Sequence, residues 1–491
     1  MLHFIALLFL LDTMASTTSS SSPPLSLAKA NSTFSLDLLK QLSDEDKKAN
    51  IFCSPFSITS ALAMVMLGTR GSTAAQISEV LGFTEGDQPK EEGEPPKEEG
   101  EQPKEEGDQP KEEGDQPKEE GDQPMEQEQT QMRVQMRYPT RCQMQMQQRM
   151  KMQLQQASRL PPYLRQCLKP QTGDDGVHAK LGQLLKDLNK ENAAYAISLA
   201  NRLYGEQTYH FKNDYLLKTK KHYSAELECV DFKAKAEEAR ATINRWVDDK
   251  TKGKIKELLQ EGVVDGSTVL VLVNAIYFKG KWAQKFNESD TAEEQFRITK
   301  NEAKAVKMMR QKSKFSFRAI PEAKIKVLEM PYEGGDISMI ILLPDDIMDD
   351  STGLETLEKT LTHQNFVDWT RPDMMNMEEV TVKLPRFNLE ESYNLNEVLK
   401  KMGMVDVFDV SKSDFSGMSL ANNLVLSKVI HKANVEVTEE GTEATAATGA
   451  VVAERAAELS SEFFADHPFL FFIKHIPSKT ILFSGRFCNP E

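Results

Sequence analysis

Hydrophobic and polar positions along this chain follow patterns that predict both helices and strands. Apolar residues recur at helical spacing over Ser26–Leu42, which predicts an amphipathic helix. Val269–Phe278 is β-rich and too apolar for an exposed face, so we expect a buried central strand there. Ile337–Pro344 and Val380–Phe387 predict further strands. Helical and strand segments do not alternate strictly, which favours an α+β fold over a doubly wound parallel sheet.

Residues 84–175 follow neither pattern. Residues 87–121 are five heptads of the form DQPKEEG, each with Pro and Gly and without an apolar residue, so they cannot form a coiled-coil seam. These repeats carry a net charge of −10, whereas the Gln/Met-rich residues 125–170 carry +6. We expect a solvated, disordered insertion. It is either a surface loop expanded by repeat duplication or an interaction segment whose basic part binds an acidic partner.

Residues 1–24 form a leader that is first apolar and then rich in Ser. Leu2–Leu11 is ten residues long, which is too short for a membrane-spanning helix. A signal peptide would explain the apolar run, but no Lys or Arg precedes it. Met14 is an alternative start, which would leave a disordered lead-in. The residues leave both interpretations open.

The overall composition narrows the function classes. The formal charge of the 491-residue chain is −15, so we expect no general attraction to nucleic acid or anionic membrane. Its five cysteines are scattered and lack a C-x-x-C pair, which argues against a disulfide framework and a metal site and suits a reducing compartment. The sequence also has no G-x-S-x-G elbow, no phosphate-binding glycine loop and no H-E-x-x-H motif.

Residues 439–455 read EEGTEATAATGAVVAER and have unusually small side chains. A segment so poor in large apolar groups cannot stabilise itself by burial, so we expect an exposed loop. In an extended conformation, Thr and Ala would fill one face, and Glu443 would lie on the other face, in water. Such a segment could also enter a narrow slot between strands. The sequence therefore permits two states, a loop outside and a strand inside.

This pattern resembles the reactive-loop hinge of the serpins, and the resemblance covers residues 25–83 and 176–491. Further blocks that resemble the family, in family order, are Asn50–Ile77, Ile197–Glu206, Ile243–Leu259, Leu272–Trp282, the run FFADHPFLFFI from Phe463 and the terminal FSGRFCNP. The resemblance, which is nearest to the ovalbumin-type branch, implies an α+β serpin fold. That fold has three β-sheets, about nine helices and an exposed reactive loop, here residues 439–462. Residues 25–491 would form one domain interrupted by 84–175.

The resemblance also implies which bond a protease attacks. Counting fourteen residues on from Gly441, and counting back from the FFADHPF run, both lead to Arg455, with Ala456 after the cut. An Arg at this position suits a trypsin-like protease, whose primary pocket carries a carboxylate. Cleavage after Val452 or Ala453 by an elastase-like enzyme, or a cysteine protease target, is the alternative.

The resemblance also implies two groups of functional residues, a hinge and a polar gate. The hinge that enters the main sheet would comprise Glu439, Glu440, Gly441, Thr442, Glu443, Ala444, Thr445, Ala446, Ala447 and Thr448. The polar gate beneath the sheet would comprise Ser54, Ser57, Asn274 and His431, with Trp282 and Glu439 at the upper opening. Short hydroxyls, an amide and an imidazole can exchange hydrogen bonds as strands part.

The resemblance implies an inhibitor and not an enzyme. Its partner would be a serine protease held as a covalent acyl-enzyme, and we expect a monomer without cofactor, metal or nucleic acid. A heparin-like cofactor is not expected, because His178–Asn192 offers only Lys180, Lys186 and Lys190, with acids interspersed. The branch usually lacks a cleaved signal, which favours the cytoplasm, with the extracellular space as the alternative. A non-inhibitory storage, carrier or chaperone serpin is the rival function.

Overall fold

The computed structural model describes residues 25–83, 174–189, 195–421, 423–441 and 460–490. The expected leader, nearly all of the expected insertion and residues 442–459 of the expected reactive loop lie outside these ranges. The predictions for those segments are therefore not tested by the structure.

The described residues form nine α-helices and fourteen strands, with three short 3-10 turns. The helices are α1 (Leu25–Glu45), α2 (Pro55–Met66), α3 (Gly71–Val80), α6 (Asp174–Leu188), α7 (Asn213–Tyr223), α8 (Phe232–Lys250), α9 (Glu355–Thr360), α10 (His363–Trp369) and α11 (Asn396–Met402). The strands are β1 (Ile51–Cys53), β2 (Tyr195–Glu206), β3 (Leu227–Val230), β4 (Leu270–Gly280), β5 (Ala292–Thr299), β6 (Glu302–Ile320), β7 (Ile325–Pro331), β8 (Ile337–Pro344), β9 (Asn376–Pro385), β10 (Phe387–Asn394), β11 (Leu426–Val437), β12 (Ser461–Phe464), β13 (Phe469–His475) and β14 (Thr480–Phe487).

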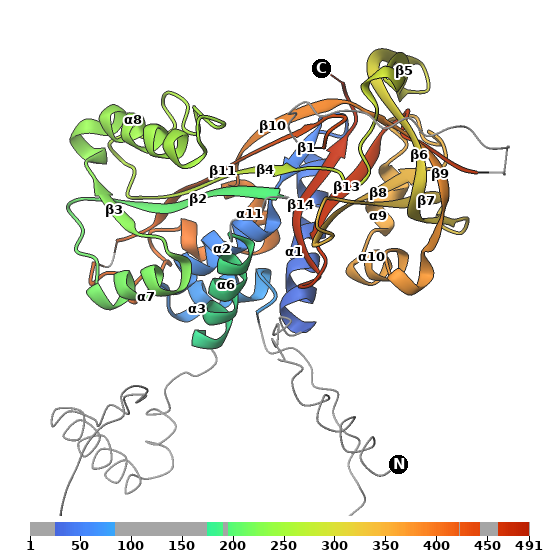
Figure 1. The fold of residues 1–491 in the computed structure, drawn as a ribbon. Coiled ribbons are helices and arrows are strands. Elements are labelled where there is room, and N and C mark those ends of the chain that lie inside the picture. The colour runs from blue at the N-terminus through green and yellow to red at the C-terminus, as the bar shows by residue number, and fades with distance from the viewer. Residues whose placement is uncertain (1–24, 84–173, 190–194, 422, 442–459, 491) are drawn as a thin grey trace, which may run out of the picture. The chain divides into compact units, whose positions relative to one another are not determined.

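A five-stranded sheet in the order β10-β11-β4-β2-β3 carries helices on both faces. On β4, Val271 and Val273 pack toward α8, whereas Leu270 and Leu272 join the main core on the side of α2 and α6 (Figure 1). This alternation follows from the period of two residues along a strand. Both faces are covered, which explains why β4 reads as a continuous apolar run in the sequence.

The remaining strands form one hydrogen-bonded sheet in the order β1-β14-β13-β8-β7-β6-β9-β12, with β5 paired to β6. The 19-residue strand β6 pairs with β7 near its carboxyl end and with β9 and β5 over the rest of its length. Because β6 pairs with β7 on one side and with β9 on the other, two of the three expected sheets form one continuous sheet. The α+β serpin architecture with nine described helices is confirmed.

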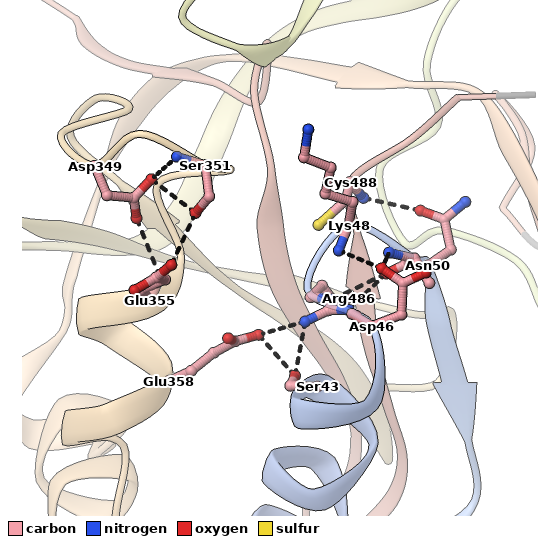
Figure 2. Close-up of polar contacts among 11 residues, drawn as sticks. Ser43, Asp46, Lys48, Asn50, Asp349, Ser351, Glu355, Glu358, Arg486 and Cys488 are labelled. Atoms are coloured by element: carbon pink, nitrogen blue, oxygen red, sulfur yellow. Dashed lines mark hydrogen bonds and ion pairs between the residues drawn. The ribbon is translucent and has the colours of Figure 1, made fainter.

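Buried Arg486 fixes the carboxyl-terminal strand β14 to the first helix (Figure 2). Its guanidinium donates hydrogen bonds to the Ser43 hydroxyl at 2.9 Å and to the carbonyls of Asp46 and Ala49, and it forms a 3.0 Å ion pair with Glu358. The Arg486 side chain is fully buried. We call these contacts the Arg486 clamp. These acceptors compensate the buried charge of Arg486, and removing them would leave that charge unpaired in the core.

Most of the strands and helices predicted from the sequence are confirmed, and one has wrong bounds. The helix predicted at Ser26–Leu42 is α1, and the strand predicted at Ile337–Pro344 is β8. Val380–Phe387 is not one strand, because β9 ends at Pro385 and β10 begins at Phe387 in the other sheet. Pro385 cannot donate to a ladder, and the chain changes sheets directly after it. The block Ile243–Leu259 contains the carboxyl-terminal part of helix α8, which begins at Phe232 and ends at Lys250.

Candidate functional site

The centre of the five-stranded sheet is a parallel pair of strands, β11 and β4, which we call the parallel seam. The neighbouring β10–β11 and β2–β4 pairs are antiparallel. The seam pairs Leu426–Val435 with Leu270–Phe278, with one irregularity near Leu426. Parallel pairing has slanted hydrogen bonds and is slightly less stable per residue than antiparallel pairing.

Two polar side chains meet directly across the middle of the seam. His431 on β11 and Asn274 on β4 are register partners, and the imidazole Nδ1 hydrogen-bonds the Asn274 side-chain oxygen. The backbone N–H of Ser54 donates to Nε2 of His431 at 3.1 Å. Since Nε2 accepts this bond, the ring proton lies on Nδ1 and is donated to Asn274. Both side chains are buried.

The amino terminus of α2 supplies the hydroxyl groups of this network. Ser54 caps the helix, because its hydroxyl accepts the Ser57 N–H at 3.3 Å, and Pro55 occupies the first helical position. The Ser54 hydroxyl also donates to the Leu482 carbonyl on β14 at 2.7 Å. Ser57 accepts a hydrogen bond from the Asn274 amide. Local helix capping thus places both serines beneath the seam.

Asn201 on β2 completes the network, although the sequence analysis did not select it. Its side-chain oxygen accepts hydrogen bonds from the Asn274 amide and from the Ser57 hydroxyl, the latter at 3.3 Å. We call these residues the polar cluster: Ser54, Ser57, Asn201, Asn274 and His431. The segment ISLANRLY gives only a weak signal for Asn201, because Ser198 and Arg202 are also polar and nothing local distinguishes Asn201 from them.

Burial keeps the polar cluster uncharged. Desolvation lowers the pKa of His431 to about 3, so its imidazole is neutral at physiological pH. Tyr393 stacks beside it, with ring centroids 6.3 Å apart. A network of neutral donors and acceptors can exchange partners without leaving a bare charge in the core.

The upper end of the seam is fastened by backbone and ring contacts. Trp282 stacks on Tyr332 with ring centroids 4.4 Å apart and donates its indole N–H to the Thr438 carbonyl at 3.0 Å. The carbonyls of Glu440 and Glu439 accept backbone hydrogen bonds from Trp282 and Phe286 respectively. Of the two residues predicted at this opening, Trp282 bonds to the carbonyls of both chain neighbours of Glu439, and Glu439 itself bonds to Phe286.

The side chains of Glu439 and Glu440 are also held. Buried Glu439 accepts a 2.8 Å hydrogen bond from the Thr291 hydroxyl and lies 3.7 Å from the Arg386 guanidinium. Glu440 pairs with Lys285. The chain is therefore firmly attached to the body of the molecule up to this point.

Gly441 is the last described residue before the expected hinge segment. Its φ is +129°, and a Cβ there would lie 2.3 Å from the Gly280 carbonyl oxygen, so only glycine fits. The described chain resumes at Ser460 and enters β12, which pairs with β9 in the other sheet. The other predicted hinge and reactive-bond residues lie outside the described residues: Thr442, Glu443, Ala444, Thr445, Ala446, Ala447, Thr448, Arg455 and Ala456.

Metal sites and reactive thiols would be other sources of chemistry among the described residues. No group of His, Cys, Asp and Glu there could hold a metal ion. Burial raises the pKa of the Cys53 and Cys488 thiols to about 12, and both cysteines are free, as is exposed Cys229. No described helix is long and apolar enough to cross a membrane.

Comparison with known proteins decides the family. The model of the serpin (serine protease inhibitor) family matches residues 29–111 and 134–490. This chain belongs to the serpin family. It is 43% identical to leukocyte elastase inhibitor of Sus scrofa and 42% identical to that of Homo sapiens, each over 94% of this chain and 99% of the relative. It is 40% identical to serpin B6 of Pongo abelii over the same shares.

Solved structures agree with this assignment. Uncleaved ovalbumin matches with a TM-score of 0.71 and 34% identity, over 95% of this chain and all of that chain. Maspin matches with a TM-score of 0.70 and 30% identity, over 94% and 98%. This serpin is thus of the ovalbumin type, and its relatives are named as protease inhibitors and not as enzymes.

Proposed function

We propose that this serpin inhibits trypsin-like serine proteases and that the attacked bond lies between Arg455 and Ala456. The guanidinium of Arg455 can pair in a bidentate manner with a carboxylate in the protease's primary pocket. The protease serine attacks the Arg455 carbonyl carbon, the bond to the Ala456 nitrogen breaks, and the departing amine takes a proton from the protease histidine. An ester between the serine oxygen and Arg455 remains.

The parallel seam is the observation that carries the proposed trap. The chain leaves β11 through Gly441, next to the end of β4, where Gly441 bridges to Lys281. A segment that turned back there and entered between β11 and β4 would run antiparallel to both strands. One parallel ladder would be replaced by two antiparallel ladders, which are more stable per residue. The sheet thus has a place for one more strand, and the hinge has the small side chains to fill it.

The distance travelled makes the trap effective. About fifteen residues of strand at about 3.3 Å each span roughly 50 Å. A protease bound as an ester to Arg455 would be carried along that distance. Serpin loop insertion is an established example of stored strain released by a loop. In this chain, the polar cluster would act as the gate, because its neutral hydrogen bonds can be exchanged as β11 and β4 separate.

The decisive experiment is incubation of the full chain with trypsin and, separately, with elastase, followed by denaturing electrophoresis. We expect a covalent band with trypsin and, after hydrolysis of the ester, a carboxyl end at Arg455 by mass spectrometry. Arg455→Ala should abolish the trypsin complex, and Arg310→Ala, at an exposed position of β6, is the matched control. A trypsin band that persists in Arg455→Ala would move the reactive bond elsewhere. Cleavage by both enzymes without any covalent band would favour a non-inhibitory serpin.

Thr442→Arg tests the hinge separately from the reactive bond. Insertion would bury this guanidinium early, and burying an unpaired charge is costly. We expect cleavage at Arg455 to continue while the yield of covalent complex falls at least tenfold. Glu443→Arg, on the opposite face of the extended segment, should keep most of the yield. Equal yields for Thr442→Arg and the unmodified chain would refute the hinge assignment.

We also propose that residues 25–491 work as one monomeric inhibitory domain in the cytoplasm, interrupted by a surface insertion at 84–175. The ovalbumin-type relatives support this proposal. Deleting residues 86–172 should leave the rate and yield of trypsin inhibition unchanged. A slower rate, or a partner lost from the deletion variant, would favour an interaction role for the insertion.

A further inference from the structure

A short exposed turn precedes strand β5. This 3-10 turn, η1 (Glu288–Asp290), is capped by the Asn287 side chain, which accepts the Ser289 N–H at 3.2 Å. Two backbone hydrogen bonds complete the turn, and its residues are all exposed. A segment with so few bonds, all close to solvent, opens locally at little cost. A partner protein can therefore draw it into an extended conformation.

The residues around Thr291 are strongly acidic. Thr291 lies in the segment ESDTAEE, residues 288–294. Glu294 is paired with Lys383. The other acids of the segment are exposed and form no ion pair with another described residue: Glu288, Asp290 and Glu293. Their carboxylates stand on both sides of one hydroxyl group, in an arrangement that a protein with a basic binding groove would recognise.

Thr291 suits such a partner better than Ser289, the other hydroxyl of the segment. Ser289 lies inside the 3-10 turn and its hydroxyl faces Asp290 at 3.3 Å. Thr291 follows the turn and already has an extended backbone, with φ −84° and ψ 123°. In an extended chain, side chains two residues apart point to the same side. The Thr291 hydroxyl and the Glu293 carboxylate can thus be presented together.

The Thr291 hydroxyl also contacts the upper end of the parallel seam. It donates a 2.8 Å hydrogen bond to the buried carboxylate of Glu439, two residues before Gly441. The N–H of Phe286 donates to the Glu439 carbonyl, so one segment holds both the side chain and the backbone of this residue. Because this segment follows β4 and Glu439 follows β11, these contacts join the two sides of the seam. A change of charge at Thr291 would act directly on that junction.

We propose that Thr291 is phosphorylated by an acid-directed serine/threonine kinase and that the phosphate loosens the upper end of the seam. The Thr291 oxygen attacks the γ-phosphorus of Mg²⁺-bound ATP and forms a new P–O bond. The bond from this phosphorus to the ADP oxygen breaks, and ADP leaves with the bonding electrons. The hydroxyl proton passes to the carboxylate base of the kinase.

The product replaces a hydrogen-bond donor with an anion. A phosphate of charge about −2 cannot donate to Glu439 and repels its carboxylate. Arg386 lies 3.7 Å from Glu439 and brings one positive charge, which cannot neutralise both anions. We therefore expect β11 and β4 to separate more readily at this end. The phosphorylation site does not rest on the proposed inhibitory function, whereas faster loop insertion does.

The first test incubates the native full chain with casein kinase II and Mg²⁺–ATP and locates the phosphate by mass spectrometry. We expect phosphate on Thr291, lost in Thr291→Val and kept in Thr291→Ser. Glu288→Gln/Glu293→Gln should slow this reaction about fivefold, as expected for the loss of two exposed charge contacts. The matched control is Glu237→Gln/Glu238→Gln, two exposed acids of α8. Equal rates in both charge variants, or phosphate only on other residues, Ser289 included, overturn the site.

The second test compares the chain before and after phosphorylation of Thr291. We expect a lower melting temperature and about threefold faster uptake of a synthetic peptide of residues 442–453, which corresponds to one lost hydrogen bond. Phosphatase should restore both values. Thr291→Val treated with the kinase is the control for phosphate elsewhere in the chain, and it should show neither change.

The two outcomes of the second test are read separately. Unchanged melting and unchanged uptake after phosphorylation of Thr291 overturn the effect on the seam. A chain that takes up no peptide and forms no complex with trypsin refutes the proposed function but leaves the phosphorylation site to be judged by the first test alone.

Discussion

The parallel seam and the Arg486 clamp are two buried polar regions with opposite designs. The seam is crossed by neutral groups, each with a few partners, centred on His431 and Asn274. The clamp places one full charge among carbonyls, a hydroxyl and Glu358. Removing a neutral group lowers the free energy of unfolding by the value of the hydrogen bonds that are lost. Breaking a buried ion pair lowers it further, because an uncompensated charge is left in the core. Under the proposed function, the seam would separate while the Arg486 clamp stays intact.

The largest effect is expected at the clamp. Arg486→Met leaves Glu358 and the Ser43 hydroxyl without their cation, so we expect a loss of about 3–5 kcal/mol in the free energy of unfolding. Urea unfolding followed by circular dichroism measures it. Arg371→Met, which breaks an exposed pair with Asp373, should leave the urea midpoint unchanged. Similar midpoints for both variants would contradict the proposed contrast.

A smaller loss is expected in the polar cluster. Asn274→Ala removes the acceptor of the His431 ring proton and two donated hydrogen bonds, so we expect about 1–3 kcal/mol of destabilisation. Asn388→Ala, at an exposed position of β10, is the control. The comparison with the clamp fails if Asn274→Ala costs as much as Arg486→Met.

The pH dependence sharpens the comparison further. The pKa of His431 is about 3 when folded and near 6.5 when unfolded, so the unfolded chain binds more protons between these values. Stability is therefore fully present above about pH 6.5 and falls as the pH is lowered toward 3, by up to about 1.4 kcal/mol per pH unit. His431→Gln should flatten the curve of melting temperature against pH in this window. His210→Gln, at an exposed site, should not, and equal curves for both would rule out His431 as the sensor.

The smallest effect is expected at the upper end of the seam. Trp282→Phe loses the hydrogen bond to the Thr438 carbonyl but keeps a ring against Tyr332, so we expect a loss of about 1 kcal/mol. Thermal melting compared with Trp369→Phe, a half-buried tryptophan on α10, would measure it. A loss above that of Asn274→Ala would make the upper contacts, and not the polar cluster, the stronger restraint.

The seam strands could be predicted from sequence because burial on both faces leaves a clear apolar run. The partners of His431 came from the family resemblance, since no local pattern joins Ser54, Asn274 and His431. Asn201 was missed because its role depends on lying opposite Asn274 across β2 and β4, which is a matter of register. Register between distant strands is set by tertiary packing and leaves little trace in one strand's own sequence.

The clamp was missed for a related reason. Arg486 stands in the terminal segment FSGRFCNP, where an arginine between aromatic residues reads equally well as a solvated side chain. Its burial depends on acceptors from α1 and α9, far away in the chain. The strand break between Pro385 and Phe387 was also missed, because the apolar spacing continues while the chain changes sheets.

The residues that flank segment 442–459 are attached to different sheets. Gly441 bridges to Lys281 at the end of β4, and Ser461 pairs with β9. Under the proposed function, an uncleaved segment attached to β9 at its far end would be unable to insert along the full length of β11. Under the proposed function, cleavage would free the part attached at Gly441 to insert in one direction only, while the part attached to β9 would stay behind.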